Sequence, residues 1–152
     1  MKRVLAARPA GPPYRARVCR GRPWAVIDDA DGFPEAGLND YLTFVAWQDQ
    51  PPRHCLHAAH DLANAATWLG FHHLTWGEAD RAVWAAYCQD LAGERPDRAA
   101  WLAVYRATAT LHRLYAFWHW RRWVRWQPFP GSQGERHEWL QAILPPPTDI
   151  VD

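Results

Sequence analysis

The stretch Asp97–Trp126 reads DRAAWLAVYRATATLHRLYAFWHWRRWVRW, and it decides the fold class. Asp97 is a residue type that caps helix amino termini, and apolar residues follow it at helical spacing. The apolar row consists of Trp101, Val104, Leu111, Leu114 and Trp118. Pro128 sets the latest point at which this helix can end. A single helix from Asp97 to that point would have about 30 residues, which exceeds the length of most globular helices. We therefore predict a long helix toward Trp126 with a break near Trp118–Trp120.

Three segments before this stretch also have helical spacing. A first helix is predicted at about Leu38–Gln48 and a second at about Arg53–Leu69, closed by Gly70. A third is predicted to start at the capping box Thr75–Glu78 and to end before Gly93. The three apolar stripes are Leu38, Tyr41, Leu42 and Val45; Cys55, Ala59, Leu62, Ala66 and Leu69; and Val83, Trp84, Tyr87 and Leu91.

The two ends of the chain have a different character. Trp24–Ile27 reads as a short extended piece, and Asp28–Pro34 reads as a turn. The tail, 127–152, is rich in Pro and Gly, so we expect a linker with at most one or two helical turns. The predicted fold is all-α, a four- to five-helix orthogonal bundle with a basic amino-terminal arm and a Pro-rich tail. The predicted organisation is an arm and acidic turn segment at 1–36, a helical domain at 37–126 and the linker or tail at 127–152.

Charge is unevenly distributed along the 152 residues, although 17 Lys and Arg nearly balance 16 Asp and Glu. Residues 1–23 contain no acid and seven basic residues, which are Lys2, Arg3, Arg8, Arg15, Arg17, Arg20 and Arg22. Residues 24–50 contain six acids and no Lys or Arg, and Arg dominates again after Trp101. Two basic ends favour binding to a polyanion. The alternative is that these charges simply cover solvated faces.

The segment Arg113–Trp126 interleaves four Arg with four Trp. Guanidinium groups suit phosphate oxygens, and indole faces can stack on Arg or on exposed bases. Two alternatives remain. Trp118 fits the core row, so Trp120, Trp123 and Trp126 could pack on neighbouring helices under Arg side chains, with Trp84 and Trp101 also in the core. Attachment to a membrane surface would need a cleaner division into polar and apolar faces.

Neither a metal site nor a catalytic constellation is expected. His54, Cys55, His57 and His60 fan around a helix, so solvated or hydrogen-bonded histidines explain them better than zinc does. No phosphate-binding loop or nucleophile motif occurs, and no cofactor is expected. No apolar run could span a membrane, and three Cys at wide spacing suit a reducing cytoplasm. We therefore expect a cytoplasmic protein that is not an enzyme.

Several short motifs between about residues 24 and 130 resemble those of a known family. They are Val26–Gly32, Leu42–Val45, Pro51–Leu62, Trp68–Gly70, Leu74–Trp76, Arg113–Phe117 and Pro128–Pro130. The resemblance is to the amino-terminal part of phage-integrase-like tyrosine recombinases of actinobacterial type. It implies a helical, SAM-like core-binding domain that clamps one face of the recombination site. The nucleophilic Tyr of that family lies in a separate carboxy-terminal domain, and no Tyr follows Tyr115 here.

The predicted function is therefore that of a non-catalytic domain that binds double-stranded DNA, with possible homo-oligomers on the DNA and no membrane partner. Candidate phosphate contacts are Arg106, Arg113, Arg121, Arg122 and Arg125, with Arg15, Arg17, Arg20 and Arg22 from the arm. Candidate groove contacts on the second helix are His57, His60 and Asn64. The alternative is a protein-interaction module, or a degenerate recombinase remnant, whose Trp- and Arg-rich surface meets a partner.

Overall fold

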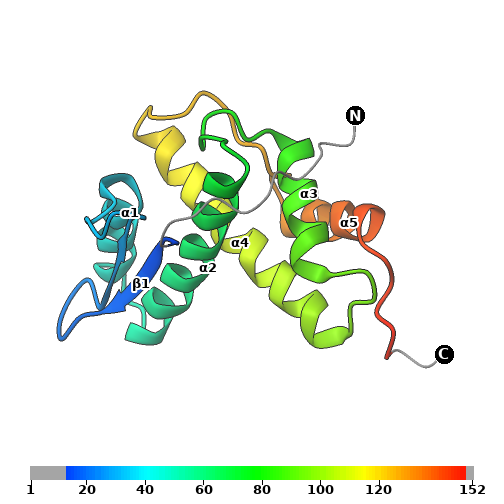
Figure 1. The fold of residues 1–152 in the computed structure, drawn as a ribbon, viewed down its shortest axis with the longest axis horizontal. Coiled ribbons are helices and arrows are strands. Elements are labelled where there is room, and N and C mark those ends of the chain that lie inside the picture. Colours follow the sequence, from blue (N-terminus) through cyan, green and yellow to red (C-terminus); the bar gives the residue numbers. More distant parts are fainter. Residues whose placement is uncertain (1–12, 150–152) are drawn as a thin grey trace. The chain divides into compact units, whose positions relative to one another are not determined.

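A computed structural model describes residues 13–149, and the chain divides into two compact units, Met1–Trp76 and Gly77–Asp152 (Figure 1). The described part is mostly helical, as the apolar spacing predicted, and it also contains a two-stranded antiparallel sheet that an all-α fold lacks. The division after Trp76 falls between the second and third helices, inside the helical domain predicted at 37–126. Each unit is therefore considered by itself.

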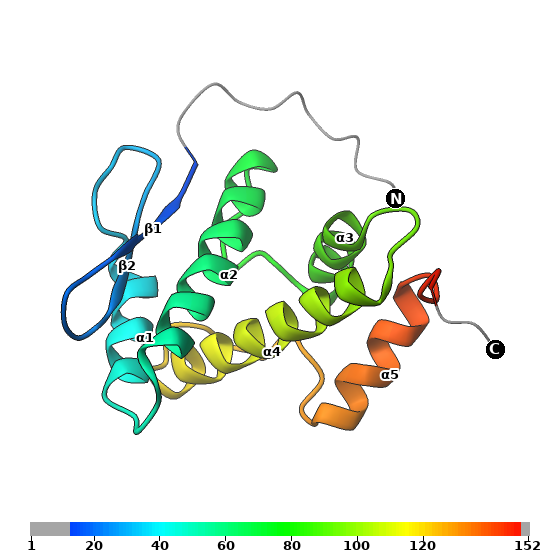
Figure 2. The same cartoon turned by 90° about the horizontal axis from the view of Figure 1, so that it is seen from below.

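The first unit contains the sheet and two helices. Strands β1 (Arg15–Val18) and β2 (Ala25–Asp28) pair with Ala16 opposite Ile27, and the sheet packs against α2 (Pro52–Phe71) (Figure 2). Helix α1 (Ala36–Ala46) contacts both α2 and β2. The predicted extended piece is thus β2. Part of the basic arm forms β1 and is ordered by its pairing with β2.

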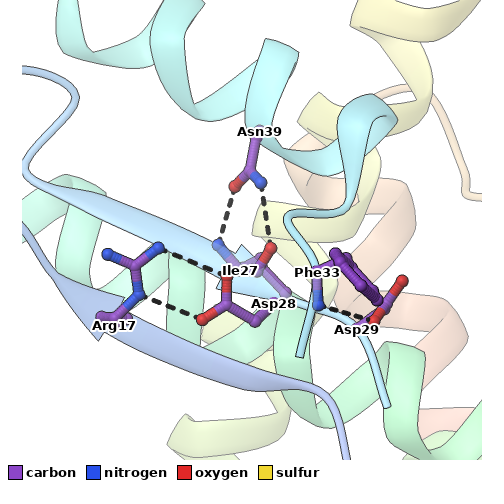
Figure 3. A network of polar contacts seen from close by, with 6 residues as sticks. All are labelled: Arg17, Ile27, Asp28, Asp29, Phe33 and Asn39. Atoms are coloured by element: carbon purple, nitrogen blue, oxygen red, sulfur yellow. Dashed lines mark hydrogen bonds and ion pairs between the residues drawn. The ribbon is translucent and has the colours of Figure 1, made fainter. Parts of the chain in front are cut away.

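Polar side chains fix the start of α1 against the sheet (Figure 3). Asn39 accepts a hydrogen bond from the Ile27 N–H (2.7 Å) and donates one to the Ile27 carbonyl (2.9 Å), as a neighbouring strand would. Asp29 accepts from the backbone N–H of Phe33 (3.0 Å), which closes the turn after β2. Glu35 is the N-cap of α1 and accepts from the Leu38 N–H. The acidic segment is therefore used largely to build local structure.

The predicted stripes of α1 and α2 are buried, apart from Val45, which is half-buried. One charged residue of α2 is also buried, since Asp61 is only 6% exposed. Helix α2 also does not close at Gly70. It ends in a Schellman motif with His73 at φ 55° and with the Leu74 N–H bonded to the Leu69 carbonyl at 2.9 Å.

The second unit consists of α3 (Arg81–Ala92), α4 (Arg98–Trp120) and α5 (Gln133–Ile143), and α4 packs against both of the other helices (Figure 2). A cluster of aromatic rings joins these elements, with Trp84 at 5.7 Å from Phe129 and 6.0 Å from Tyr115 between ring centroids. A second group of buried residues is formed by Cys88, Ala92, Val104, Leu140 and Leu144. Trp84 and Trp118 are buried as predicted, whereas Trp101 is half-buried.

The ends of α3 and α4 test the predicted caps. Asp97 caps α4 as expected, accepting from the Ala100 N–H at 2.8 Å. The capping box at Thr75–Glu78 is wrong, because Asp80 is the N-cap of α3 and accepts from the Val83 N–H at 2.9 Å. A carboxylate directly before the apolar stripe thus caps the helix in place of the upstream hydroxyl. Leu91, assigned to the buried stripe of α3, is 39% exposed.

The tail differs most from expectation. We predicted at most two helical turns after Gln127, but α5 has eleven residues, starts at the N-cap Ser132 and buries Leu140. The polyproline segment is also attached to the unit. The Trp101 indole donates to the Pro145 carbonyl (2.8 Å), and the Thr148 N–H donates to the Pro96 carbonyl (2.9 Å). Residues 133–149 therefore belong to the folded second unit.

Candidate nucleic-acid interface

The carboxyl end of α4 carries the Trp- and Arg-rich segment. The helix stops at Trp120, at the predicted break, because the backbone there forms a Schellman motif. The predicted continuation of the helix toward Trp126 is wrong, because residues 121–126 are turn and irregular structure. Arg122 has φ 62°, its N–H donates to the His119 carbonyl, and the Trp123 N–H donates to the Trp118 carbonyl at 2.8 Å. This turn fixes the backbone positions of two successive site residues, Arg122 and Trp123.

Phe117 packs against two of the Trp residues that follow it. It is buried, and its ring lies 6.1 Å from that of Trp120 and 6.4 Å from that of Trp123. The Arg121 guanidinium lies over the Trp123 ring at 5.1 Å from its centroid. The other faces of these indoles meet solvent, since Trp120, Trp123 and Trp126 are 69%, 50% and 52% exposed. The alternative in which these three Trp pack beneath neighbouring helices is therefore wrong.

The sequence on both sides of these Trp residues contains basic residues and no acidic ones. Residues 98–134 contain six Arg and no Asp or Glu. Arg113, Arg122 and Arg125 are exposed, and within residues 13–149 their guanidinium groups form no ion pair. Arg106 is also exposed and lies seven residues before Arg113, on the same side of α4. The predicted sites on α4 and its following turn thus form one continuous segment.

Arg136 on α5, which is not among the predicted site residues, also lies near this surface. The pKa of His112 on α4 is lowered by burial, by the charge of Arg136 on α5 and by that of Arg113. Arg136 therefore adds positive potential at His112. In the sequence, the only signal for Arg136 is that it follows the other Arg residues of this region. The segment around it was predicted to be a linker, so nothing indicated that Arg136 lies near α4.

The arm arginines lie in the first unit, on β1 and on the loop that follows it. Arg17 pairs with Asp28 at 3.0 Å (Figure 3), and Arg22 lies over the Trp47 ring at 4.7 Å. Arg15 and Arg20 are exposed, and neither forms an ion pair with any residue of 13–149. Lys2, Arg3 and Arg8 lie outside the described residues. Two of the four proposed arm contacts are thus already engaged within the unit.

The proposed groove contacts form a stripe on α2. His57, His60 and Asn64 are exposed and lie at positions i, i+3 and i+7, so they share one face of the helix. Asp61, one turn after His57, is buried and does not add to this exposed stripe. These three polar residues and the Arg of β1 belong to the same unit, separate from that of α4.

Other features that could support a different chemistry are few in the described range. No group of three or more His, Cys, Asp or Glu suited to a metal ion occurs in residues 13–149. The same residues include no helix with the length and apolarity needed to cross a membrane. A groove of about 410 Å³ in the second unit is lined by Arg98, Trp101, Leu102, His137, Gln141, Leu144, Pro146 and Pro147.

Comparison with known proteins finds no matching family, no matching curated protein and no matching solved structure.

Proposed function

We propose that this protein is a non-catalytic, double-stranded DNA-binding protein whose main phosphate contacts lie at the end of α4. One observation carries the proposal: exposed Arg113, Arg122 and Arg125 have no ion-pair partner within residues 13–149, and no acid occurs between residues 98 and 134. Phosphate oxygens are the natural partners of such guanidinium groups. Arg106 and Arg121 extend the same surface.

We propose further that the helices form an orthogonal, SAM-like core-binding arrangement, as the resemblance to tyrosine recombinases implies. The high helical content supports this type of fold. Tyr115 has a structural role in this arrangement, because it is fully buried and its hydroxyl accepts a hydrogen bond from the Trp84 indole at 3.3 Å. Burial raises the pKa of this phenol, which makes it a poor nucleophile.

The first unit adds a second set of contacts in this proposal. Arg15 and Arg20 reach phosphates from β1 and its loop, while Arg17 and Arg22 contribute less because Asp28 and Trp47 already hold them. His57, His60 and Asn64 face a DNA groove from the exposed side of α2. In this proposal the contacts to phosphates provide affinity, and these three polar side chains provide the sequence specificity.

The test is duplex binding by fluorescence anisotropy across a series of salt concentrations. We expect binding whose logarithm falls linearly with log salt, and the variant Arg122→Ala/Arg125→Ala to reduce the slope by about 2. The control is Arg95→Ala, which removes one charge from an exposed position outside all the proposed contacts and leaves the slope nearly unchanged. If the duplex is not bound at low salt, or if both variants behave like the parent, the proposal is wrong.

A second candidate function is protein interaction, because large aromatic side chains and Arg also dominate protein interfaces. The observation that favours it is the exposure of three Trp within seven residues of one another. Self-association in sedimentation that is insensitive to salt, together with no DNA binding, would support this function over the first. The same experiment with DNA present reports whether the protein forms homo-oligomers on the duplex.

A further inference from the structure

We infer that the exposed indoles of Trp120, Trp123 and Trp126 stack on unpaired bases, so that this surface binds single-stranded DNA more tightly than duplex DNA. The inference rests on the proposed function, because the same arginines hold the phosphates. It goes beyond that function in naming the nucleic-acid state that the surface prefers.

The first support is that two of the three rings have packing partners within the protein before any ligand arrives. Trp120 and Trp123 both lean on the buried Phe117, at 6.1 and 6.4 Å between centroids. The Schellman hydrogen bond from the Trp123 N–H to the Trp118 carbonyl fixes the backbone beneath the second ring. A rigid aromatic side chain loses little conformational freedom when a ligand stacks on it.

The second support is the chemistry of the exposed faces. Half or more of each indole is in water, which is costly for so apolar a group and marks a binding surface. In a duplex the base faces are stacked on one another, and a protein meets only base edges and phosphates. Unpaired bases instead expose the faces that an indole can stack on, and each such contact contributes about a tenfold gain in affinity.

The third support is charge complementarity. Arg113, Arg122 and Arg125 come before and between these Trp in the sequence and have no ion-pair partner among residues 13–149, while Arg121 lies over the Trp123 ring. Alternating cations and aromatic rings match the alternating phosphates and bases of a single strand. Anionic lipid also combines negative charge with an apolar phase. It requires one apolar helix face, whereas Arg121 and Arg122 lie between Trp120 and Trp123.

The experiment compares the affinities of labelled dT20 and of a 20-base-pair duplex for the full chain at one salt concentration. We expect the parent to bind dT20 at least tenfold more tightly, and Trp120→Leu/Trp123→Leu to lose about a hundredfold on dT20 and less than threefold on the duplex. The control is Phe33→Leu in the first unit. Phe33 is 68% exposed, so this variant removes an exposed aromatic ring outside the proposed surface and keeps the parent's affinities.

A second measurement follows the parent protein itself, with the variants used only to assign its signals. In the 5-fluorotryptophan-labelled parent, we expect the signals that are missing from Trp120→Leu and Trp123→Leu to shift on addition of dT20, and the signal of the fully buried Trp84, assigned with Trp84→Phe, to stay in place. Equal affinity for the two DNAs, or an equal loss on both in the Trp variant, overturns this inference and leaves the proposed duplex binding intact. Binding of dT20 without duplex binding overturns the proposed function alone. Trp signals that shift on phosphatidylserine vesicles but not on dT20 overturn the inference in favour of a membrane surface.

Discussion

At the scale of single residues, many charged side chains have roles that a count of charges misses. Asp29, Glu35 and Asp97 accept backbone hydrogen bonds in a turn and at two helix starts, and Asp28 pairs with Arg17. These acids are committed to local structure. Arg113, Arg122 and Arg125 have no such commitment in the described part of the chain. The net charge of +1 therefore understates how much positive charge is free to meet a ligand.

His112 gives the chain a stability that depends on pH. Burial, Arg136 and Arg113 lower its pKa below the ordinary 6.5, so the unfolded chain binds more protons than the folded chain once the pH falls below about 6.5. We therefore expect the free energy of unfolding to decrease as the pH drops through 6.5 toward the lowered pKa, and the variant His112→Gln to show a shallower decrease. Denaturant unfolding at several pH values measures both.

The companion variant Arg136→Gln separates the causes. Removing this charge raises the pKa of His112, and proton-detected titration of the imidazole follows the change directly. A His112→Gln protein that loses stability on acidification as steeply as the parent would contradict the assignment.

At the scale of elements, the end of α4 combines a structural device with the proposed binding surface. Arg122 occupies the left-handed position of the Schellman motif, where Gly is the usual residue. Arg122→Gly should raise the free energy of unfolding by about 1 kcal/mol, because an L side chain at this φ is strained. DNA affinity should fall at the same time, because a cation is lost. Urea unfolding and anisotropy measure the two effects.

The neighbouring substitution Arg121→Gly is the control. Arg121 has φ −77°, which any residue adopts, so glycine there only adds freedom to the unfolded chain and should destabilise by about 0.5–1 kcal/mol. Equal destabilisation by the two substitutions would mean that Arg122 carries no strain.

The elements that the sequence predicted are those with wide apolar stripes. The row Trp101, Val104, Leu111, Leu114 and Trp118 located α4, and Asp97 located its first residue. Helix α5 was missed because Leu140 is its only buried residue among Pro- and Gly-rich neighbours. The hairpin was missed because a β1 of alternating Arg and small residues gives no strand signal until it pairs with Ala25 and Ile27.

The candidate site was predicted in its residue types but not in its exposure. The identities of Arg113, Arg122, Trp120 and Trp123 follow from the sequence, but their exposure depends on where α4 stops and on the Phe117 ring beneath them. Arg136 could not be placed, since its approach to α4 depends on α5.

Helix α5 should contribute strongly to the stability of the second unit. Leu140 is fully buried with Val104, Cys88 and Leu144, so Leu140→Ala should lower the free energy of unfolding by about 2–4 kcal/mol. The adjacent Gln141 is exposed, and Gln141→Ala should change it by less than about 0.5 kcal/mol. A loss below about 1 kcal/mol for Leu140→Ala, measured by urea unfolding, would mean that the tail is the dispensable linker that its composition indicates.

At the scale of the whole molecule, each unit is nearly neutral, but in each unit the acidic and the basic residues lie in different stretches of the sequence. In the second unit, five acids lie within residues 77–97, and the six Arg of residues 98–134 follow with none. In the first unit, basic residues 1–23 precede acidic residues 24–50. The two proposed DNA contacts thus come from different units, and each can be tested by substitutions that leave the other unit untouched.

The division into two units predicts where the effect of a core truncation stops. Leu62 lies fully buried on α2, which packs against α1 and the sheet, all within Met1–Trp76. Leu62→Ala should lower the amide protection of α1 and α2 by about a hundredfold, while amides of α4 keep most of theirs; Leu140→Ala should do the reverse. Native-state hydrogen exchange with peptide-level mass spectrometry reads both patterns from the same samples. If either substitution lowers protection equally in α2 and α4, the units unfold as one, and the boundary at Trp76 has no energetic meaning.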